Sequence, residues 1–73
     1  MNFGQLIRAK RDAQGFTLQE VADAAGISKS HLHGLENENY PNPGLYTAVR
    51  LSVALGLPLQ AMGAAILETE RKP

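Results

Sequence analysis

The polar side chains with the most varied chemistry lie in one short run, from Ser28 to Asn37. His31 and His33 are two residues apart, so on a helix they diverge and cannot share a metal ion as an i, i+4 pair would. Ser30 and His33 are three apart and can touch, but neither an orienting acid nor an oxyanion loop is implied nearby. We therefore expect no metal, no cofactor and no enzymatic activity, and we interpret the run as a binding surface.

The run has two distinct sides when it is drawn as a helix with 100° per residue. Leu32 and Leu35 define the buried side, and Lys29 and His31 flank the opposite side near its amino end. An ordinary solvated helix face is one interpretation of that side, and a surface that recognises a polar partner is the other. The opposite side consists of Ser30, His33, Gly34 and, just past the end, Asn37.

Five segments with helical spacing of apolar residues predict an all-α domain of five short helices. Asn2 and Thr17 are each followed three residues later by Gln5 and Glu20, which is the spacing of a capping box at a helix start. We expect one domain over residues 1–69 and a short loose tail over 70–73. The first helix is expected over 3–13, the second from its cap Thr17 to Gly26, and the third from its cap Ser28 to about residue 36. The fourth is expected to have Asn42 as its cap and Pro43 as its first residue, and to stop at Gly56. The fifth is expected to run from Pro58 to about residue 68.

The last two helices are expected to contribute one apolar face each to the core. In the fourth, the inward residues are predicted to be Leu45, Ala48, Val49, Ser52 and Leu55. The fifth has more apolar surface than one buried stripe requires. We expect Leu59, Met62 and Ile66 to pack inside, and Leu57 and Leu67 to form a self-association patch.

Composition excludes several classes of protein. The chain has 73 residues and no cysteine, so disulfides and thiolate zinc sites are excluded. The longest apolar stretch, residues 61–67, is too short to span a bilayer, and without an export signal we expect a cytoplasmic protein that does not act at a membrane. Seven Lys and Arg balance seven Asp and Glu, so net charge alone gives no argument for nucleic acid.

The segment around Gly26 has the residue types of a helix-turn-helix. Ala22 is small enough for a close helix crossing, and Gly26 tolerates positive φ in the turn. The helix after the turn carries Leu32 and Leu35, two apolar side chains three residues apart that it can bury against the first helix. This segment, Leu18 to Glu36, resembles the helix-turn-helix of the Cro and phage-repressor family, also called the xenobiotic-response-element type. The resemblance continues outside it, at Ile7-Arg8, Arg11, Gly15-Phe16-Thr17, Pro43-Gly44-Leu45 and Ala54-Leu55-Gly56.

The resemblance implies a compact lambda-repressor-like fold and a bacterial or phage-type regulator, a repressor or activator of transcription. It would bind double-stranded operator DNA as a homodimer with its third helix in the major groove. No small-molecule ligand is implied. The base-contacting residues implied are Lys29, Ser30, His33 and Gly34, and the phosphate-contacting residues are Ser28, Asn37, Tyr40 and Arg8. Arg11 and Glu36 occupy the positions of a family ion pair that braces the recognition helix.

Two departures from the family keep an alternative open. Leu18 stands where many members have a phosphate-contacting Gln, and the loop of residues 37–42 contains Glu38 and no Lys or Arg. These features, together with the balanced charge, favour a protein-interaction module of the same fold. Lys29, Ser30 and His33 favour DNA.

Overall fold

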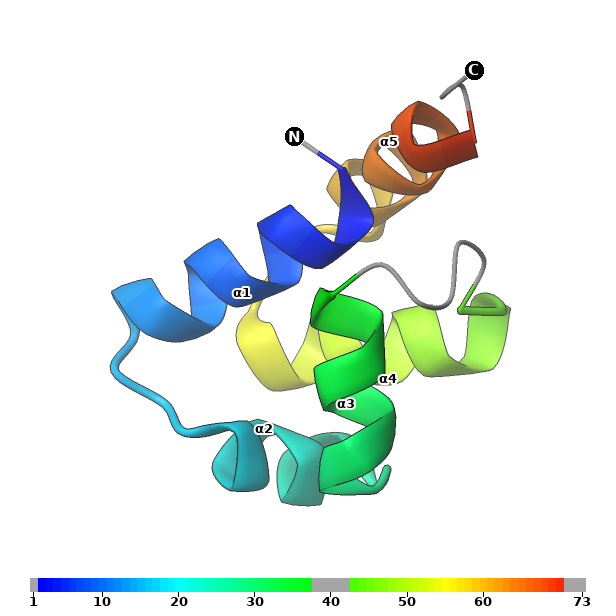
Figure 1. Ribbon diagram of the computed structural model, residues 1–73. Helices are drawn as coiled ribbons and strands as arrows, with labels where there is room; N and C mark the ends of the chain where they lie inside the picture. Colours follow the sequence, from blue (N-terminus) through cyan, green and yellow to red (C-terminus); the bar gives the residue numbers. More distant parts are fainter. Residues whose placement is uncertain (1, 38–42, 71–73) are drawn as a thin grey trace.

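The computed structural model describes residues 2–37 and 43–70, and every regular element within them is an α-helix (Figure 1). The predicted all-α class with five helices is confirmed. The Cα radius of gyration is 10.9 Å, close to the ~11 Å expected for a folded chain of this length. The helices are α1 (Phe3–Ala13), α2 (Leu18–Ala25), α3 (Lys29–Glu36), α4 (Leu45–Leu55) and α5 (Leu59–Glu70).

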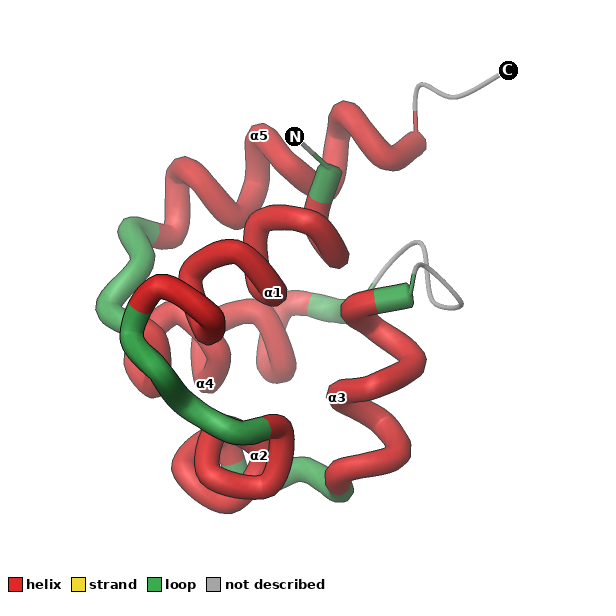
Figure 2. The backbone as a smooth tube through the Cα atoms, turned by 60° about the vertical axis from the view of Figure 1, so that its left-hand side comes forward, coloured by secondary structure: helices red, strands yellow, loops and turns green. Residues whose placement is uncertain are grey.

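The helices are arranged so that α3 connects the two ends of the molecule. Figure 1 shows α1 and α5 together at one end and α2 at the other, with α4 behind α3. Figure 2 shows the same arrangement from the side, with the short connection between α2 and α3 at the end away from α5. The amino end of α3 therefore lies beside α2, and its carboxyl end lies beside α1.

Side-chain caps fix where the first three helices begin. The Asn2 side chain accepts from the Gln5 amide at 2.9 Å, and the Gln5 side chain accepts from the Asn2 amide at 3.1 Å. The same reciprocal box joins Thr17 and Glu20 at the start of α2. Both boxes were predicted and are confirmed, as is Ser28 as the cap of α3.

The predicted start of α4 is wrong by two residues. Gly44, not Asn42, is the N-cap, and Pro43 precedes the helix. Gly44 has φ +83°, which is outside the helical region, so the helix cannot include it or anything before it. The predicted cap Asn42 lies outside the described residues. At the other end of the chain α5 continues to Glu70, so Glu70 is helical rather than part of a loose tail, and residues 71–73 lie outside the described part.

The side of α4 that faces the core also differs in part from the prediction. Leu45 is 73% exposed and Val49 is 39% exposed, so their predicted inward positions are wrong. Ala48 and Leu55 are buried as predicted, Ser52 is half-buried, and Leu51, which shares one face with Ala48 and Leu55 at i, i+3 and i+7, is buried although it was not predicted. In α5, Met62 is buried as predicted, whereas Leu59 is largely exposed. The buried apolar core consists of Phe3, Ile7, Val21, Ala22, Ala25, Leu32, Leu35, Leu51, Leu55, Met62 and Ala65, with Ala48 also buried.

A backbone contact between helices positions α3. A Cβ atom at Gly4 would lie only 2.7 Å from the carbonyl oxygens of Leu35 and Glu36. The start of α1 therefore packs directly on the backbone at the end of α3, which only glycine permits. The Gln14 side-chain amide, just after α1, donates to the carbonyl of Leu55 at 2.7 Å and so ties α1 to the end of α4.

Candidate nucleic-acid interface

The turn between α2 and α3 is built as the sequence predicts. Gly26 has φ +69° and ends α2 in the left-handed conformation. The amide of Ile27 donates to the carbonyl of Ala22 at 3.0 Å, which closes the turn. The next residue, Ser28, is the N-cap of α3, and its hydroxyl accepts from the His31 amide at 3.0 Å. The Ser28 hydroxyl keeps its own proton and can still donate to an acceptor outside the protein.

The outer side of α3 carries three of the four predicted base-contacting residues. Lys29, Ser30 and His33 are all exposed, while Leu32 and Leu35 on the opposite side are fully buried. The three exposed residues lie in the amino-terminal five residues of the helix, so their side chains project from one region. That region offers an ammonium, a hydroxyl and an imidazole, all of which can donate hydrogen bonds to base edges.

Gly34 does not belong to this exposed stripe. The sequence predicts it there, beside His33, but the structure buries it. A glycine has no side chain to project beyond its neighbours, so its position on a helical wheel does not make it accessible. We therefore leave Gly34 out of the candidate contact set.

The predicted phosphate-contacting residues have different surroundings. Ser28 lies exposed at the start of α3, where unpaired backbone N–H groups and the helix dipole favour an anion. Asn37 is exposed but caps the end of α3, because its side-chain amide donates to the carbonyl of His33 at 2.7 Å. Arg8 is exposed on α1 and lies 3.9 Å from the Asp12 carboxylate, which offsets part of its charge. Tyr40 lies outside the described residues.

The predicted ion pair between Arg11 and Glu36 is present. Nε of Arg11 donates to Oε2 of Glu36 at 2.8 Å, and Nη2 donates to Oε1 at 3.0 Å, so the contact is bidentate. The third nitrogen, Nη1, donates to the carbonyl of Phe16 at 2.9 Å. One guanidinium thus joins α1, the segment before α2 and the last residue of α3.

This ion pair is shielded from solvent. The Glu36 side chain is 4% exposed and the Arg11 side chain 13%. The hydrogen bonds from Arg11 to Glu36 raise the pKa of the guanidinium, and the carboxylate charges of Glu36 and Asp12 add to the effect against the opposing effect of burial. Arg11 is therefore committed to holding α3 in place and is not a free cation for a phosphate.

Arg50 is a second positioning residue, and the sequence analysis missed it. From α4 its Nε donates to the carbonyl of Ala25, the last residue of α2, and its Nη1 donates to the Tyr46 hydroxyl at 3.0 Å. The Tyr46 ring also lies 5.4 Å from the guanidinium carbon. A Cβ atom at Gly26 would lie 2.9 Å from that carbon, so a larger residue there would have to displace the guanidinium in addition to adopting the positive φ. The i, i+4 spacing of Tyr46 and Arg50 is visible in the sequence, but their contact with α2 depends on the tertiary fold.

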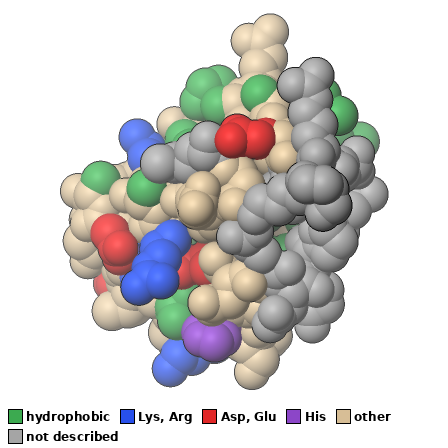
Figure 3. All heavy atoms as spheres, turned by 45° about the horizontal axis from the view of Figure 1, so that its top comes forward, with side chains coloured by type: hydrophobic (Ala, Val, Ile, Leu, Met, Phe, Trp, Pro, Cys, Tyr) green, Lys and Arg blue, Asp and Glu red, His purple; other side chains and the backbone are tan. Residues whose placement is uncertain are grey.

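Charges of both signs are mixed on the surface. On the face shown in Figure 3, Lys and Arg side chains are scattered rather than gathered into one patch, and those near the centre lie next to Asp and Glu side chains. Among the described residues there is no cluster of three His, Cys, Asp or Glu that could hold a metal ion. Within the same part of the chain, none of the helices is long and apolar enough to cross a membrane.

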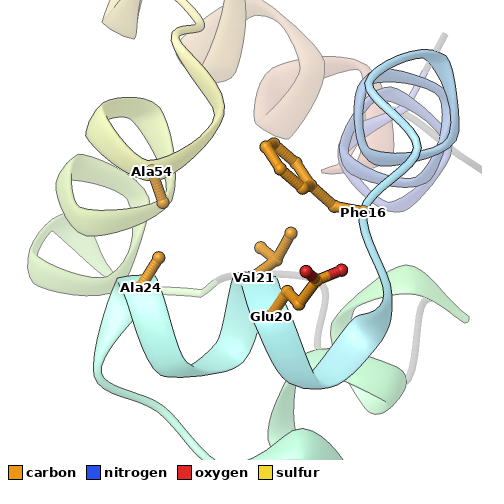
Figure 4. Close-up of a pocket in the computed structure, with 5 residues that line it drawn as sticks. All are labelled: Phe16, Glu20, Val21, Ala24 and Ala54. Atoms are coloured by element: carbon orange, nitrogen blue, oxygen red, sulfur yellow. The ribbon is translucent and has the colours of Figure 1, made fainter.

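A small apolar hollow lies where α2 meets α4, away from the exposed side of α3. Figure 4 shows Phe16 and Ala54 facing each other across it, with Val21 and Ala24 on the α2 side. Glu20 is at the rim, where its carboxylate accepts from the Thr17 amide. The hollow is lined mainly by carbon atoms and adjoins the outer face of α4.

The two residues predicted for a self-association patch have different environments. Leu57 is half-buried and packs against the core, so its main contacts are internal. Leu67 on α5 is 63% exposed and accessible. The sequence could not separate the two, because both lie at the edges of an apolar segment.

Comparison with known proteins gives the family. The sequence model of the helix-turn-helix family matches residues 7–62. The transcriptional regulator SinR of Bacillus subtilis is 31% identical over 67 residues, which cover 92% of this chain and 60% of SinR. The immunity repressor protein of Bacillus phage phi105 is 36% identical over 62 residues, covering 85% of this chain and 42% of that repressor. The chain thus spans about 60% or less of the length of these relatives.

Solved structures agree with the sequence comparison. The N-terminal DNA-binding domain of SinR superimposes with a TM-score of 0.77 at 30% identity, covering 82% of this chain and 87% of that domain. The restriction-modification controller protein C.AhdI of Aeromonas hydrophila gives a TM-score of 0.77 at 28% identity and covers 82% of this chain and 89% of that protein. Since the family match spans most of the chain and includes α2, the turn and α3, the chain belongs to the helix-turn-helix family of Cro and phage-repressor type.

Proposed function

We propose that this protein is a sequence-specific DNA-binding transcriptional regulator that inserts α3 into the major groove. The observation that carries the proposal is the exposed stripe of Lys29, Ser30 and His33 on the second helix of a helix-turn-helix. The names of its relatives support the same class, since they are a transcriptional regulator, an immunity repressor and a controller protein.

The side chains of the stripe have complementary roles on DNA. Lys29 donates to guanine O6 or N7, His33 donates to a purine N7, and Ser30 donates or accepts. Ser28 and the first backbone amides of α3 hold a phosphate beside them. Asn37 and Tyr40 are neutral donors to the phosphate backbone, and Arg8 is a cation that an anion can draw from Asp12.

Arg11 and Glu36 position α3 rather than contact DNA. Base readout needs donors held within a fraction of an ångström, and the bidentate ion pair holds the far end of the reading helix. Gly26 and Arg50 hold its near end. The far end of α3 is thus attached to α1, and the turn that precedes its near end is attached to α4.

The small number of free cations determines how the protein binds DNA. With Arg11 committed to Glu36, about two or three cationic phosphate contacts remain per subunit among the described residues, so we expect their non-specific binding to be weak and to depend little on salt. A homodimer doubles these contacts and reads two half-sites one DNA turn apart. We therefore propose that the protein binds an inverted-repeat operator as a homodimer.

The test is a titration on mixed genomic DNA fragments at low and moderate salt. We expect saturable binding at low salt that weakens by a modest factor as the salt rises. Lys29→Ala should weaken binding to preferred fragments more than to bulk DNA. Equal weakening on all fragments would assign Lys29 to a phosphate, and absence of binding at low salt would contradict the proposal.

A protein-interaction module is the second candidate. Leu18, which cannot make the phosphate contact of many family members, and the mixed charges of the surface favour it. It predicts that the protein binds no DNA in the same titration.

A further inference from the structure

The outer side of α4 exposes an unusual amount of apolar surface. Leu45, Val49 and Val53 are four residues apart, so they form one stripe, and Tyr46 lies beside it. Their exposed fractions are 73%, 39%, 78% and 74% for Leu45, Val49, Val53 and Tyr46. We call these four residues the α4 face.

None of the four residues of the α4 face is charged. The only charged residue of the eleven in α4 is Arg50. Its guanidinium is already bound to the Ala25 carbonyl and the Tyr46 hydroxyl. Both partners are neutral, so the guanidinium keeps its charge, and a two-fold contact has to leave both Arg50 side chains at a solvated rim while the uncharged α4 face forms the centre.

The area of the face is sufficient to form the centre of an interface. Its four side chains expose on the order of 400 Å² per protomer, which is within the range of the largest apolar patch on a typical monomer, a patch that is often functional. A standard interface buries about 800 Å² per partner, of which a polar rim supplies a large share. The hollow formed by Ala24, Val49, Arg50 and Val53 and the adjoining one in Figure 4 extend the apolar surface towards α2.

We propose that the α4 face pairs with the same face of a second copy of this chain about a two-fold axis. Such a contact is self-complementary, because both protomers use the same patch and every contact occurs twice, once in each direction. The net charge of zero adds no overall repulsion between the copies. This proposal names the surface through which the proposed homodimer forms. It rests on the proposed function only in that the dimer would serve to bind operator DNA.

The competing surface on α5 is smaller. Its exposed large apolar residues are Leu59 and Leu67, which lie two turns apart with Gly63 between them, and Glu68 follows directly. A two-fold contact there would bring two Glu68 residues close to the interface. Apart from Arg8 on α1, the residues proposed to contact DNA lie on α3 and its flanks, and none of them belongs to the α4 face.

Sedimentation equilibrium of the purified chain and three single variants tests the proposal. Leu45→Glu and Val53→Glu place charges in the α4 face, and Leu67→Glu makes the matched change on α5. All three sites are exposed, and circular dichroism verifies that the variants fold. We expect the wild type to dimerise, the two α4 variants to dissociate on the order of 100-fold more readily, and Leu67→Glu to stay within about threefold of the wild type. A monomeric wild type, or dissociation caused by Leu67→Glu alone, would overturn the proposal.

Cross-linking gives an independent readout, because the chain has no cysteine of its own. Val49→Cys should form a covalent dimer with a short bismaleimide, whereas Leu67→Cys should not, and the reverse pattern would overturn the proposal. Lys29→Ala should remain dimeric in both experiments. If the protein dimerises through the α4 face but binds no DNA, the DNA-binding proposal fails and this one stands.

Discussion

Removing one partner of the Arg11–Glu36 ion pair should strongly destabilise the fold, and the two removals should not be equal. Arg11→Met leaves the Glu36 carboxylate, whose side chain is 4% exposed, without its two charged donors, and the Phe16 carbonyl also loses its hydrogen bond. We expect a loss of about 3–4 kcal/mol in the free energy of unfolding, the range for an uncompensated buried charge. Glu36→Gln is milder, because the amide oxygen still accepts one bond and Arg11 keeps its bond to Phe16. We expect a loss of about 2 kcal/mol.

The double variant distinguishes a direct pair from two independent effects. Once Arg11 is gone, Glu36→Gln removes an unpaired buried charge and should cost little or even stabilise. The coupling energy should therefore be about 2 kcal/mol, which a double-mutant cycle can measure. Small domains have a total stability of only about 0.05–0.15 kcal/mol per residue, so the losses expected here are a large part of the total. Urea unfolding is therefore best followed at low temperature, where the variants stay folded in the absence of urea.

Arg8→Met is the matched control for this cycle. Arg8 is also an arginine of α1, but its contact with Asp12 is 3.9 Å long and both side chains are about 60% exposed. Its removal should change the stability by less than about 0.5 kcal/mol. Additive losses for Arg11→Met and Glu36→Gln, or a loss for Arg8→Met as large as that for Arg11→Met, would refute the reasoning.

Three further predictions concern stability and are measurable by the same unfolding experiments. Gly4→Ala should destabilise by more than about 2 kcal/mol, because its Cβ would overlap carbonyl oxygens of α3, whereas Gly63→Ala, whose Cβ meets nothing within 4 Å, should stabilise by about 0.5–1 kcal/mol. Gly26→Ala should lower the free energy of unfolding by less in an Arg50→Met background than in the wild type, since only the strain of the positive φ then remains. The same loss in both backgrounds would argue against the guanidinium contact. The pKa of Arg11 is raised in the folded state, so Arg11 contributes its full stabilisation at any pH below the ordinary arginine pKa and loses it only when the pH rises through the raised pKa. The difference in the free energy of unfolding between wild type and Arg11→Met should therefore stay constant from neutral to strongly alkaline pH.

The helix starts and the ion pair could be predicted, because short-range patterns or a family resemblance specify them. Asn2 with Gln5 and Thr17 with Glu20 each satisfy a helix start through side chains three residues apart, so the local sequence is sufficient. Glu36 and Arg11 are 25 residues apart, and only the resemblance to the repressor family placed them together.

The features that the sequence analysis missed depend on the tertiary fold. The start of α4 was misplaced because Pro43 suits a first helical position, whereas the positive φ of Gly44 decides the boundary. Leu45 and Val49 were placed inwards because the apolar residues of α4 surround most of the helix, so only packing against the other helices selects Ala48, Leu51 and Leu55 as the buried side. The role of Arg50 depends on how α4 crosses α2, and the burial of Gly34 depends on having no side chain among larger neighbours.

The central claim is that α3 reads base edges, and selection of bound sites from a random oligonucleotide pool tests it most directly. Wild type, Lys29→Ala and His33→Ala are each carried through the selection, followed by sequencing of the bound DNA. The account predicts that the wild type enriches a short inverted repeat and that each variant loses preference at a different position of the half-site. No enrichment by the wild type, or the same motif for all three proteins, would contradict it.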